Sequence, residues 1–262
     1  MFHYTKAAFR VGPSILFTYL FYLRKWAKNV NKYPREKRMY KVVSLAKKIS
    51  RALNVDYQVF GLENIPSDGV FCLVCNHMSA FDPLPVMINV DKPLTFVGKK
   101  ELKKVPMLNK AIDVLEGEYM DRDNLRQSLK IMLKVEDSLR NGDKNWMIYP
   151  EGTRIRDQML PVASFHHGTF RPASKAGVPI IPVAMYGSFR VLKTKPQFKR
   201  YPIYVSILKP LMPSDYANMN TSDIATLTHD AIQREITYHL RPLDHKTMSE
   251  RKEKNYRFNA II

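Results

Sequence analysis

The chain has 262 residues, which is enough for one large domain with a hydrophobic core of its own. Hydrophobic residues make up 45% of the sequence, a content that excludes an intrinsically disordered chain. With 42 basic and 24 acidic residues the formal net charge is +18, so the surface favours a polyanionic partner, either nucleic acid or anionic lipid.

The positive charge is concentrated near the N-terminus, where residues 1–60 hold 13 basic residues and only two acidic ones, Glu36 and Asp56. The first predicted element there is an apolar, aromatic-rich run, residues 14–23. It is too short to cross a bilayer, which needs about 20 residues. Basic residues flank it, and no small-residue cleavage site of a signal peptide follows it. We therefore expect an interfacial or re-entrant segment, with a buried core helix as the alternative.

A basic amphipathic helix is predicted next, from about residue 35 to residue 53. Its apolar face comprises Val42, Val43, Leu45, Ala46 and Ile49, and its charged face comprises Lys41, Lys47, Lys48 and Arg51. Such a charged face is often only a solvated surface, but beside the apolar run it favours contact with anionic lipid headgroups. We therefore expect residues 1–53 to form a basic, apolar helical segment that associates with a membrane and is anchored in one leaflet without crossing it.

From residue 54 to residue 240 the pattern changes to alternating strands and helices. Strands are predicted at residues 57–60, 70–75, 95–98, 146–149, 180–185 and 204–207. This alternation predicts an α/β fold, with a mostly parallel central sheet flanked by helices and the N-terminal helical membrane-docking segment added to it. Residues 241–262 are predicted to be a charged, loose C-terminal tail, apart from an apolar end at residues 260–262.

The two clearest helices of this part span residues 124–140 and 222–240. The first has Asp123 placed to cap its start and Asn141 and Gly142 placed to end it. Its predicted apolar stripe comprises Leu125, Leu129, Met132, Leu133 and Leu139, and that of the second helix comprises Ile224, Leu227, Ala231, Ile232 and Ile236. An apolar stripe is the face that an amphipathic helix packs against a core.

The two cysteines, Cys72 and Cys75, have the spacing of some zinc and redox sites. No second pair completes a zinc ligand set, and both lie in a predicted buried strand, where residues three apart face opposite sides. We therefore predict buried structural thiols. Because no disulfide framework is indicated, a reducing compartment is expected.

The first stretch that carries chemistry, residues 76–82, directly follows this buried strand, and sites in α/β sheets tend to be built at strand ends. In a straight strand His77 and Asp82 would lie about 16 Å apart, and in a helix about 140° apart around the axis. They can meet only if the chain turns between them, and Pro83 indicates a helix start after such a turn. Asp82 would then orient the His77 ring and leave its other nitrogen free to act as a general base. The alternatives are a structural histidine and an Asp82 that only caps the helix.

A second polar stretch, residues 149–154, also follows a predicted strand. Gly152 permits a tight turn, Thr153 can donate a hydrogen bond, and Arg154 can bind a phosphate with two hydrogen bonds. Taken alone, this stretch is also compatible with an ordinary turn that carries an exposed salt bridge.

Together the two stretches, Asn76-His77 with Asp82 and then Pro150-Glu151-Gly152-Thr153-Arg154, resemble the glycerolipid acyltransferase superfamily and most closely its 1-acyl-sn-glycerol-3-phosphate (lysophosphatidic acid) acyltransferase branch. Residues 117–122 look like the family's second block, which ends in a phosphate-binding arginine, and residues 178–183 look like its fourth, an apolar strand beside the acyl site. The resemblance covers roughly residues 61–211. Ile155 stands where the family usually has serine, and His167 replaces a lysine that helps to hold the substrate phosphate.

The resemblance implies transfer of a fatty acyl group from acyl-ACP or acyl-CoA to the sn-2 hydroxyl of lysophosphatidic acid, giving phosphatidic acid in phospholipid biosynthesis. It implies catalytic roles for His77 and Asp82. The substrate-binding residues implied in the same way are Arg122, Glu151, Gly152, Thr153 and Arg154. No cofactor or metal is expected, because a thioester is already activated. An acyl-enzyme on Ser79 is disfavoured, since Ser79 lies only two residues from His77. The enzyme is expected to be membrane-associated at the cytoplasmic face.

A rival interpretation from another class is a non-catalytic basic module that binds nucleic acid or a membrane. The net charge supports it, but the charge lies beside an apolar aromatic segment and the sequence has no nucleic-acid motif, so no nucleic-acid partner is expected. A milder alternative is an acyltransferase for another lysophospholipid or for glycerol 3-phosphate, which the sequence separates poorly from lysophosphatidic acid.

Overall fold

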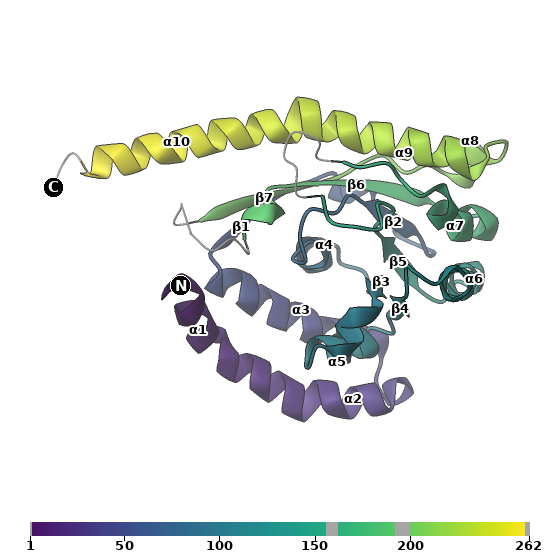
Figure 1. Ribbon diagram of the computed structural model, residues 1–262, viewed down its shortest axis with the longest axis horizontal. Helices are drawn as coiled ribbons and strands as arrows, with labels where there is room; N and C mark the ends of the chain where they lie inside the picture. Colours follow the sequence, from purple (N-terminus) through teal and green to yellow (C-terminus); the bar gives the residue numbers. More distant parts are fainter. Residues whose placement is uncertain (1, 156–161, 192–199, 260–262) are drawn as a thin grey trace.

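The computed structural model describes residues 2–155, 162–191 and 200–259 of the chain. Within them the centre is a seven-stranded sheet in the order β1-β7-β6-β2-β5-β3-β4 (Figure 1). The strands are β1 Val55–Phe60, β2 Cys72–Cys75, β3 Leu94–Lys99, β4 Glu118–Met120, β5 Asn145–Ile148, β6 Ile180–Tyr186 and β7 Tyr201–Ile207. Neighbouring strands are parallel except β6 and β7, which are antiparallel. The predicted α/β fold is confirmed, and β4 is an edge strand that was not predicted.

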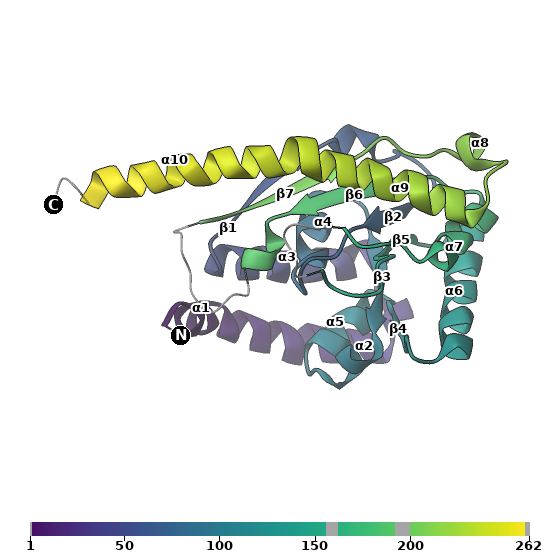
Figure 2. The same cartoon turned by 45° about the horizontal axis from the view of Figure 1, so that its top comes forward.

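Helices cover both faces of this sheet (Figures 1 and 2). They are α1 Phe2–Thr18, α2 Arg24–Lys28, α3 Arg35–Ala52, α4 Pro83–Asn89, α5 Leu108–Val114, α6 Leu125–Arg140, α7 Arg171–Ala176, α8 Pro213–Tyr216, α9 Thr221–Glu235 and α10 Arg241–Asn259. One face packs against α2, α3, α4 and α5, and the other against α6, α7 and α9. The sheet therefore separates two hydrophobic cores, as expected where crossover helices flank parallel strands.

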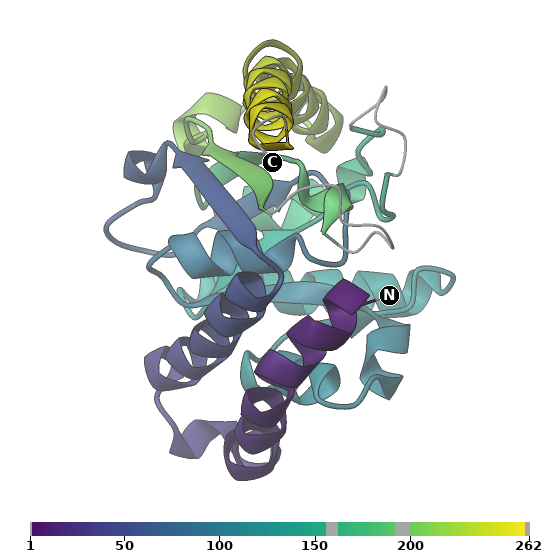
Figure 3. The ribbon, with the colours of Figure 1, turned by 90° about the vertical axis from the view of Figure 1, so that its left-hand side faces the viewer.

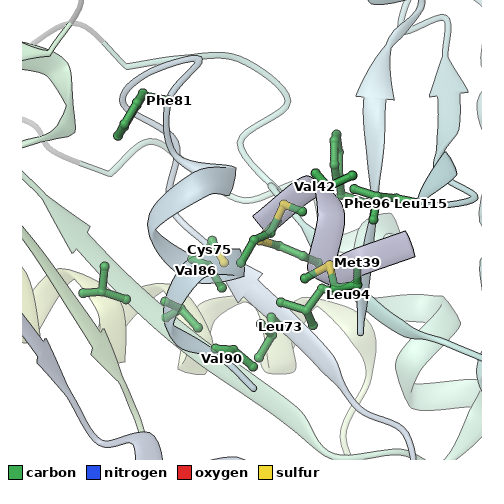
Figure 4. Packing of buried hydrophobic residues seen from close by; sticks show 14 of the residues in the cluster. Met39, Val42, Leu73, Cys75, Phe81, Val86, Val90, Leu94, Phe96 and Leu115 are labelled. Carbon is green, nitrogen blue, oxygen red and sulfur yellow. The ribbon is translucent and has the colours of Figure 1, made fainter. Parts of the chain in front are cut away.

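The two cysteines of β2 face opposite sides of the sheet, and each lies in a different one of these cores. In the first core, Met39 and Val42 of α3 meet Leu73 and Cys75 of β2 (Figure 4). Cys72 points the other way, into the core under α6 and α7. Both thiols are free and buried, as predicted, and burial raises the pKa of Cys72 to about 12. A buried thiol of high pKa is chemically inert.

The prediction for α6 is right in its limits and only partly right in its buried face, where Leu139 is buried and Met132 packs against the core as predicted. Asn124, one residue after the predicted cap, accepts a hydrogen bond from the amide of Gln127, and the helix ends at Arg140. The residues buried against α7 and the sheet are Ile131, Val135, Glu136 and Leu139. Three leucines of the predicted stripe, Leu125, Leu129 and Leu133, are exposed instead, Leu125 by 84%. The helix carries apolar residues on two sides, and helical periodicity does not say which side meets the core.

The prediction of a loose tail after Arg241 is wrong for the described residues. In Figure 1, α9 continues through a π-helical turn, Ile236–Leu240, into α10 as one long helix across the sheet. Arg190 pairs with the buried Asp244, and Arg251 binds Asp56 of β1 at 2.8 Å, so ion pairs hold α10 to the domain. The predicted apolar end, residues 260–262, lies outside the described residues.

The N-terminal helices form a separate outer layer. α1 continues through a π-helical turn, Tyr19–Leu23, into α2, and the pair lies beside α3 (Figure 3). Leu23 and Trp26 are buried in the first core, whereas Leu16, Phe17, Leu20 and Phe21 are exposed. The predicted apolar run is therefore divided, with one end packed in the protein and one side left uncovered. None of the described helices has both the length and the apolar content needed to cross a membrane.

Candidate active site

The two polar stretches meet because their strands are neighbours. β2 and β5 are parallel, and Val74 lies opposite Ile148 in the register. The residues that follow these two strands, His77 and Tyr149 among them, therefore emerge at the same edge of the sheet. The two rings are in contact, with centroids 4.4 Å apart.

The turn predicted between His77 and Asp82 is present. Nδ1 of His77 lies 2.7 Å from Oδ2 of Asp82, and α4 begins at Pro83. The same Oδ2 accepts hydrogen bonds from the backbone amides of Met78 and Ser79 at 2.7 and 2.8 Å. Asp82 is fully buried and makes no side-chain cap of α4, so the alternative of a simple helix cap does not fit. The carboxylate instead bridges the turn and the imidazole, which leaves Nε2 as the ring nitrogen available for proton transfer.

The side-chain carboxyl group of Glu151 holds the backbone amide of His77. Its Oε1 accepts a hydrogen bond from the His77 amide at 2.8 Å, while Oε2 has no hydrogen-bond partner within residues 2–155, 162–191 and 200–259. Burial raises the pKa of Glu151 to about 8, although backbone hydrogen bonds from His77 and Ala163 work in the opposite direction. An acid with such a pKa carries its proton through much of the neutral range, which lowers the cost of burying it.

A cavity of about 460 Å³ opens beside His77 between the sheet and the N-terminal helices. Its walls are mostly apolar and come from both layers, including Ile15 and Leu23 from the N-terminal layer and Phe96 and Ile112 from the α/β domain. Arg122, Thr153 and Arg154 also line it. Arg122 follows β4 and Arg154 follows β5, so two separate strand ends supply the two guanidinium groups.

Arg122 and Arg154 have no ion-pair partner in the part of the chain that the structure describes. Partial burial lowers the pKa of Arg122, as does the positive charge of Arg154, and Glu101 opposes both effects. Two neighbouring guanidinium groups repel each other unless an anion lies between them. The pair therefore places uncompensated positive charge on the cavity wall beside His77, and forked guanidinium donors are of the kind that suit a phosphate.

Three residues singled out from the sequence do not line the cavity. They are Glu151, Gly152 and His167. His167, which stands at the family's lysine position, is exposed. Gly152 adopts φ +65°, and a Cβ there would come within 3.1 Å of the His166 ring. Gly152 thus lets the chain turn against His166 and present Thr153 and Arg154 to the cavity.

Two residues of the polar stretches were given no role from the sequence. Asn76 bonds both backbone groups of Met185 on β6, at 3.0 Å through its amide and 2.7 Å through its oxygen, and so fixes the end of β2. Tyr149, the first residue of the second stretch, packs against the His77 ring and donates its hydroxyl to Met147 Sδ at 3.5 Å. Their positions inside the two stretches were the available signal. Among the described residues, no three His, Cys, Asp or Glu side chains are grouped to hold a metal ion.

Comparisons with known proteins agree with this geometry. A family model described as "Acyltransferase" matches residues 56–186. A protein of Mycoplasma pneumoniae named "Probable 1-acyl-sn-glycerol-3-phosphate acyltransferase" is 29% identical over 206 residues, covering 74% of this chain and 76% of that protein. A Haemophilus influenzae protein named 1-acyl-sn-glycerol-3-phosphate acyltransferase is 28% identical and covers 69% of this chain and 77% of its own.

A solved structure matches over most of the chain. The crystal structure of the 1-acyl-sn-glycerophosphate acyltransferase PlsC from Thermotoga maritima has a TM-score of 0.67 and 26% sequence identity, and it covers 89% of this chain and 91% of that one. The likeness therefore extends beyond the matched family region, into the N-terminal or C-terminal helices.

Proposed function

This chain belongs to the acyltransferase family, and we propose that it transfers a fatty acyl group from acyl-ACP or acyl-CoA to the sn-2 hydroxyl of 1-acyl-sn-glycerol-3-phosphate. The product is phosphatidic acid. One observation carries the proposal: a carboxylate-oriented histidine borders the same apolar cavity as two arginines that have no ion-pair partner among the described residues. Such a site suits an acceptor that combines a hydroxyl, a phosphate and a hydrocarbon chain.

In the proposed reaction, Nε2 of His77 removes the proton of the acceptor hydroxyl while the hydroxyl oxygen attacks the thioester carbonyl carbon. A tetrahedral intermediate forms and collapses, the C–S bond breaks, and the proton passes from His77 to the departing thiolate. Asp82 holds Nδ1 and stabilises the imidazolium while it carries the proton. Glu151 keeps the His77 backbone in place and is a positioning residue in this scheme.

Arg122 and Arg154 are proposed to bind the acceptor phosphate. A phosphate between two guanidinium groups would remove their mutual repulsion and would receive charge-assisted hydrogen bonds from both. Thr153, on the same wall, is placed to donate one more hydrogen bond. Gly152 contributes by permitting the turn that presents these two neighbours.

We further propose that the N-terminal layer docks the enzyme on the cytoplasmic face of an anionic membrane. Phe17, Leu20 and Phe21 are exposed apolar side chains, and Lys47 and Lys48 of α3 are exposed cations. Buried apolar area and basic charge add together when a helix lies in a membrane interface. Docking there would let a lipid acceptor enter from the leaflet while a soluble donor arrives from the cytoplasm.

The experiment that tests the reaction is an assay of purified protein with labelled acyl-CoA and acyl-ACP against lysophosphatidic acid, glycerol 3-phosphate and monoacylglycerol, with the products identified by mass spectrometry. We expect phosphatidic acid from lysophosphatidic acid and little product from the acceptor without phosphate. A dominant lysophosphatidic acid product from glycerol 3-phosphate would assign the enzyme to the other acceptor. Binding to duplex DNA at matched salt without any acyl transfer would contradict an enzyme.

Arginine variants test the phosphate site in the same assay. Arg122→Ala and Arg154→Ala should each raise the acceptor KM roughly 10–150-fold, since a charge-assisted hydrogen bond is worth about 1.5–3 kcal/mol. The donor KM should change much less, and Arg→Lys should restore only part of the loss because a bidentate fork becomes a point charge. Arg126→Ala, an exposed position on α6, is the matched control. An unchanged acceptor KM in both variants would exclude this pair as the phosphate site.

A further inference from the structure

A second exposed apolar surface lies outside the N-terminal layer, at the segment that joins β3 to α5. Its six consecutive residues, Lys103-Lys104-Val105-Pro106-Met107-Leu108, are all exposed. Val105, Met107 and Leu108 are 42%, 37% and 41% exposed, although each is a hydrophobic residue at the surface of a well-packed domain. We call these six residues the 103–108 loop.

The backbone of the 103–108 loop is held in a strained conformation. Met107 has φ 66° and ψ −47°, and the amide of Leu108 donates to the carbonyl of Pro106 at 2.8 Å. This is a γ-turn with a positive φ at a non-glycine residue, which is rare and costs conformational energy. Strain of this kind persists at functional sites, and here it turns apolar side chains outward at a loop tip.

The 103–108 loop lies close to the N-terminal layer. α5, which begins within the loop, contacts both α2 and the π-helical turn Tyr19–Leu23. Figure 3 shows α5 beside the N-terminal helices. Met107 and Leu108 line the same cavity as Ile15 and Leu23, so the two elements border the cavity from different sides.

The positive charge of the 103–108 loop indicates what kind of surface the loop could bind. Lys99, Lys100 and Lys110 are paired with Glu101, Asp121 and Asp113. Lys103 and Lys104 have no such partner in the described part of the chain, and they directly precede the apolar residues. Two free cations next to an apolar tip match the headgroup and acyl layers of an anionic leaflet.

We propose that the 103–108 loop is a second membrane-inserting element, which penetrates the same anionic leaflet as the N-terminal layer and forms the other side of the cavity entrance. The inference rests on the proposed membrane docking and adds a contact from the α/β domain. With the leaflet touched at two points, the entrance to the cavity faces lipid, and an acceptor reaches His77 without passing through water.

A labelled cysteine tests the depth of the loop directly. The native thiols are buried, so an exposed cysteine can be labelled selectively with an environment-sensitive fluorophore. Full-length Val105→Cys, Phe21→Cys and Leu129→Cys proteins would be bound to phosphatidylglycerol–phosphatidylcholine vesicles that contain nitroxide-labelled lipid. We expect a blue shift and strong quenching at positions 105 and 21. Leu129, which is exposed on α6 across the sheet, should stay in water.

The outcomes separate the two membrane proposals. Quenching at position 21 with an aqueous signal at position 105 would overturn the loop proposal and leave N-terminal docking standing. An aqueous signal at both positions, with the protein bound to vesicles, would overturn both.

A second set of variants tests energetics and an alternative partner. Replacing Val105, Met107 and Leu108 together by Ser should weaken vesicle binding at least about tenfold. Lys103→Gln with Lys104→Gln should weaken binding to anionic vesicles and not to neutral ones. If the lysine pair instead raised the KM of acyl-ACP and left vesicle binding unchanged, the loop would be a site for the acidic carrier protein and the membrane proposal would be wrong.

Discussion

The catalytic edge of the sheet and the N-terminal helical layer are built on opposite principles. At the edge, His77 is hydrogen-bonded to Asp82 and Glu151, and Asn76 to the backbone of Met185, at 2.7–3.0 Å. Asp82, Glu151 and Asn76 are buried. In the outer layer, aromatic and aliphatic side chains are exposed beside lysines, and contacts with the domain are limited to one side. Hydrogen bonds at the sheet edge fix the positions of individual atoms. The outer layer instead presents exposed apolar surface and positive charge.

The comparison teaches where single substitutions should matter. Removing one group from a hydrogen-bonded catalytic unit disables the unit, because the remaining members cannot replace its proton transfer or orientation. Removing one side chain from an apolar surface takes away only its share of the transfer free energy. The salt bridges of α3 with Glu116 form a third class, since they join partly buried charged groups that do not line the cavity.

The largest effect is expected at His77. His77→Ala should lower kcat by roughly 10²–10⁴-fold, the usual contribution of a general base, and leave vesicle binding largely intact. Asp82→Asn should cost as much or less, because it keeps the shape but disturbs the ring orientation. Steady-state kinetics with a parallel flotation assay provide the measurement. A variant without His77 that kept a tenth of wild-type turnover would show that the base is another group.

The next effect is on stability and concerns the contact between α3 and the segment that joins α5 to β4. Glu116 binds Arg35 at 3.0 Å and the buried Arg38 at 2.6 Å, both from α3. Burial tends to raise the pKa of Glu116, but hydrogen bonds from both arginines and the charge of Lys144 bring it down to about 2. Glu116→Gln should lower the free energy of unfolding by about 3 kcal/mol, since it leaves buried positive charge uncompensated.

The pH dependence of this contact has a definite sign. Because the folded pKa of Glu116 lies below its usual value of 4.5, its contribution is fully present above about pH 4.5 and is lost as the pH falls toward 2. Denaturant unfolding between pH 3 and 7 should therefore show wild type and Glu116→Gln converging at low pH. Curves that stay parallel over that range would mean that the ion pairs do not hold α3 to the domain.

A smaller effect is expected at the exposed side of the outer layer. Phe17→Gln and Phe21→Gln should each weaken binding to anionic vesicles by about tenfold, which corresponds to a share of the aromatic transfer free energy. Turnover of a short, soluble acceptor should be nearly unchanged. Leu125→Gln on α6 is the control, because that leucine is even more exposed than the two phenylalanines but lies on the other side of the sheet. Equal loss in all three variants would point to a general surface effect.

These point substitutions test membrane docking better than a deletion of residues 1–30 would. Such a deletion would also remove Leu23 and Trp26, which belong to the hydrophobic core.

The last effect is expected at Glu151 and concerns how the stability of the protein depends on pH. Since its folded pKa is about 8, above the usual 4.5, the folded protein keeps a proton that the unfolded chain loses. The stability of the wild type should therefore decline as the pH rises from about 4.5 to 8. Glu151→Gln, which resembles the protonated acid, should remove that decline and become the more stable protein by about 1–3 kcal/mol at pH 8.5, with kcat changed only a few-fold. Equal stability of the two proteins at pH 5.5 and 8.5 would contradict a protonated Glu151.

Much of the site was predictable because its main contacts are short in sequence. His77 and Asp82 are five residues apart, and the turn between them follows from a strand end and Pro83. The resemblance to the family's blocks predicted Arg122 and Arg154 as substrate-binding residues. The position of the polar stretches after predicted strands indicated a site at the ends of those strands. Contacts of this kind depend on local backbone geometry, which residue order encodes directly.

The remaining features depended on tertiary packing. Periodicity predicted Leu139 in the core correctly, but Leu125, Leu129 and Leu133 are exposed because α7 and the sheet cover only the side with Ile131, Val135 and Leu139. The charged composition after Arg241 predicts a loose tail, yet pairs with Arg190 and Asp56 hold these residues in a helix. The salt bridge of Arg38 with Glu116 joins residues 78 positions apart. Residue patterns therefore predicted most of the strands and helices, and the motifs predicted the family through their resemblance to its blocks. The choice of buried face, the partners of long charged side chains and the strained turn at Met107 were decided by which surfaces the folded chain brings together, and a periodic pattern contains no record of that.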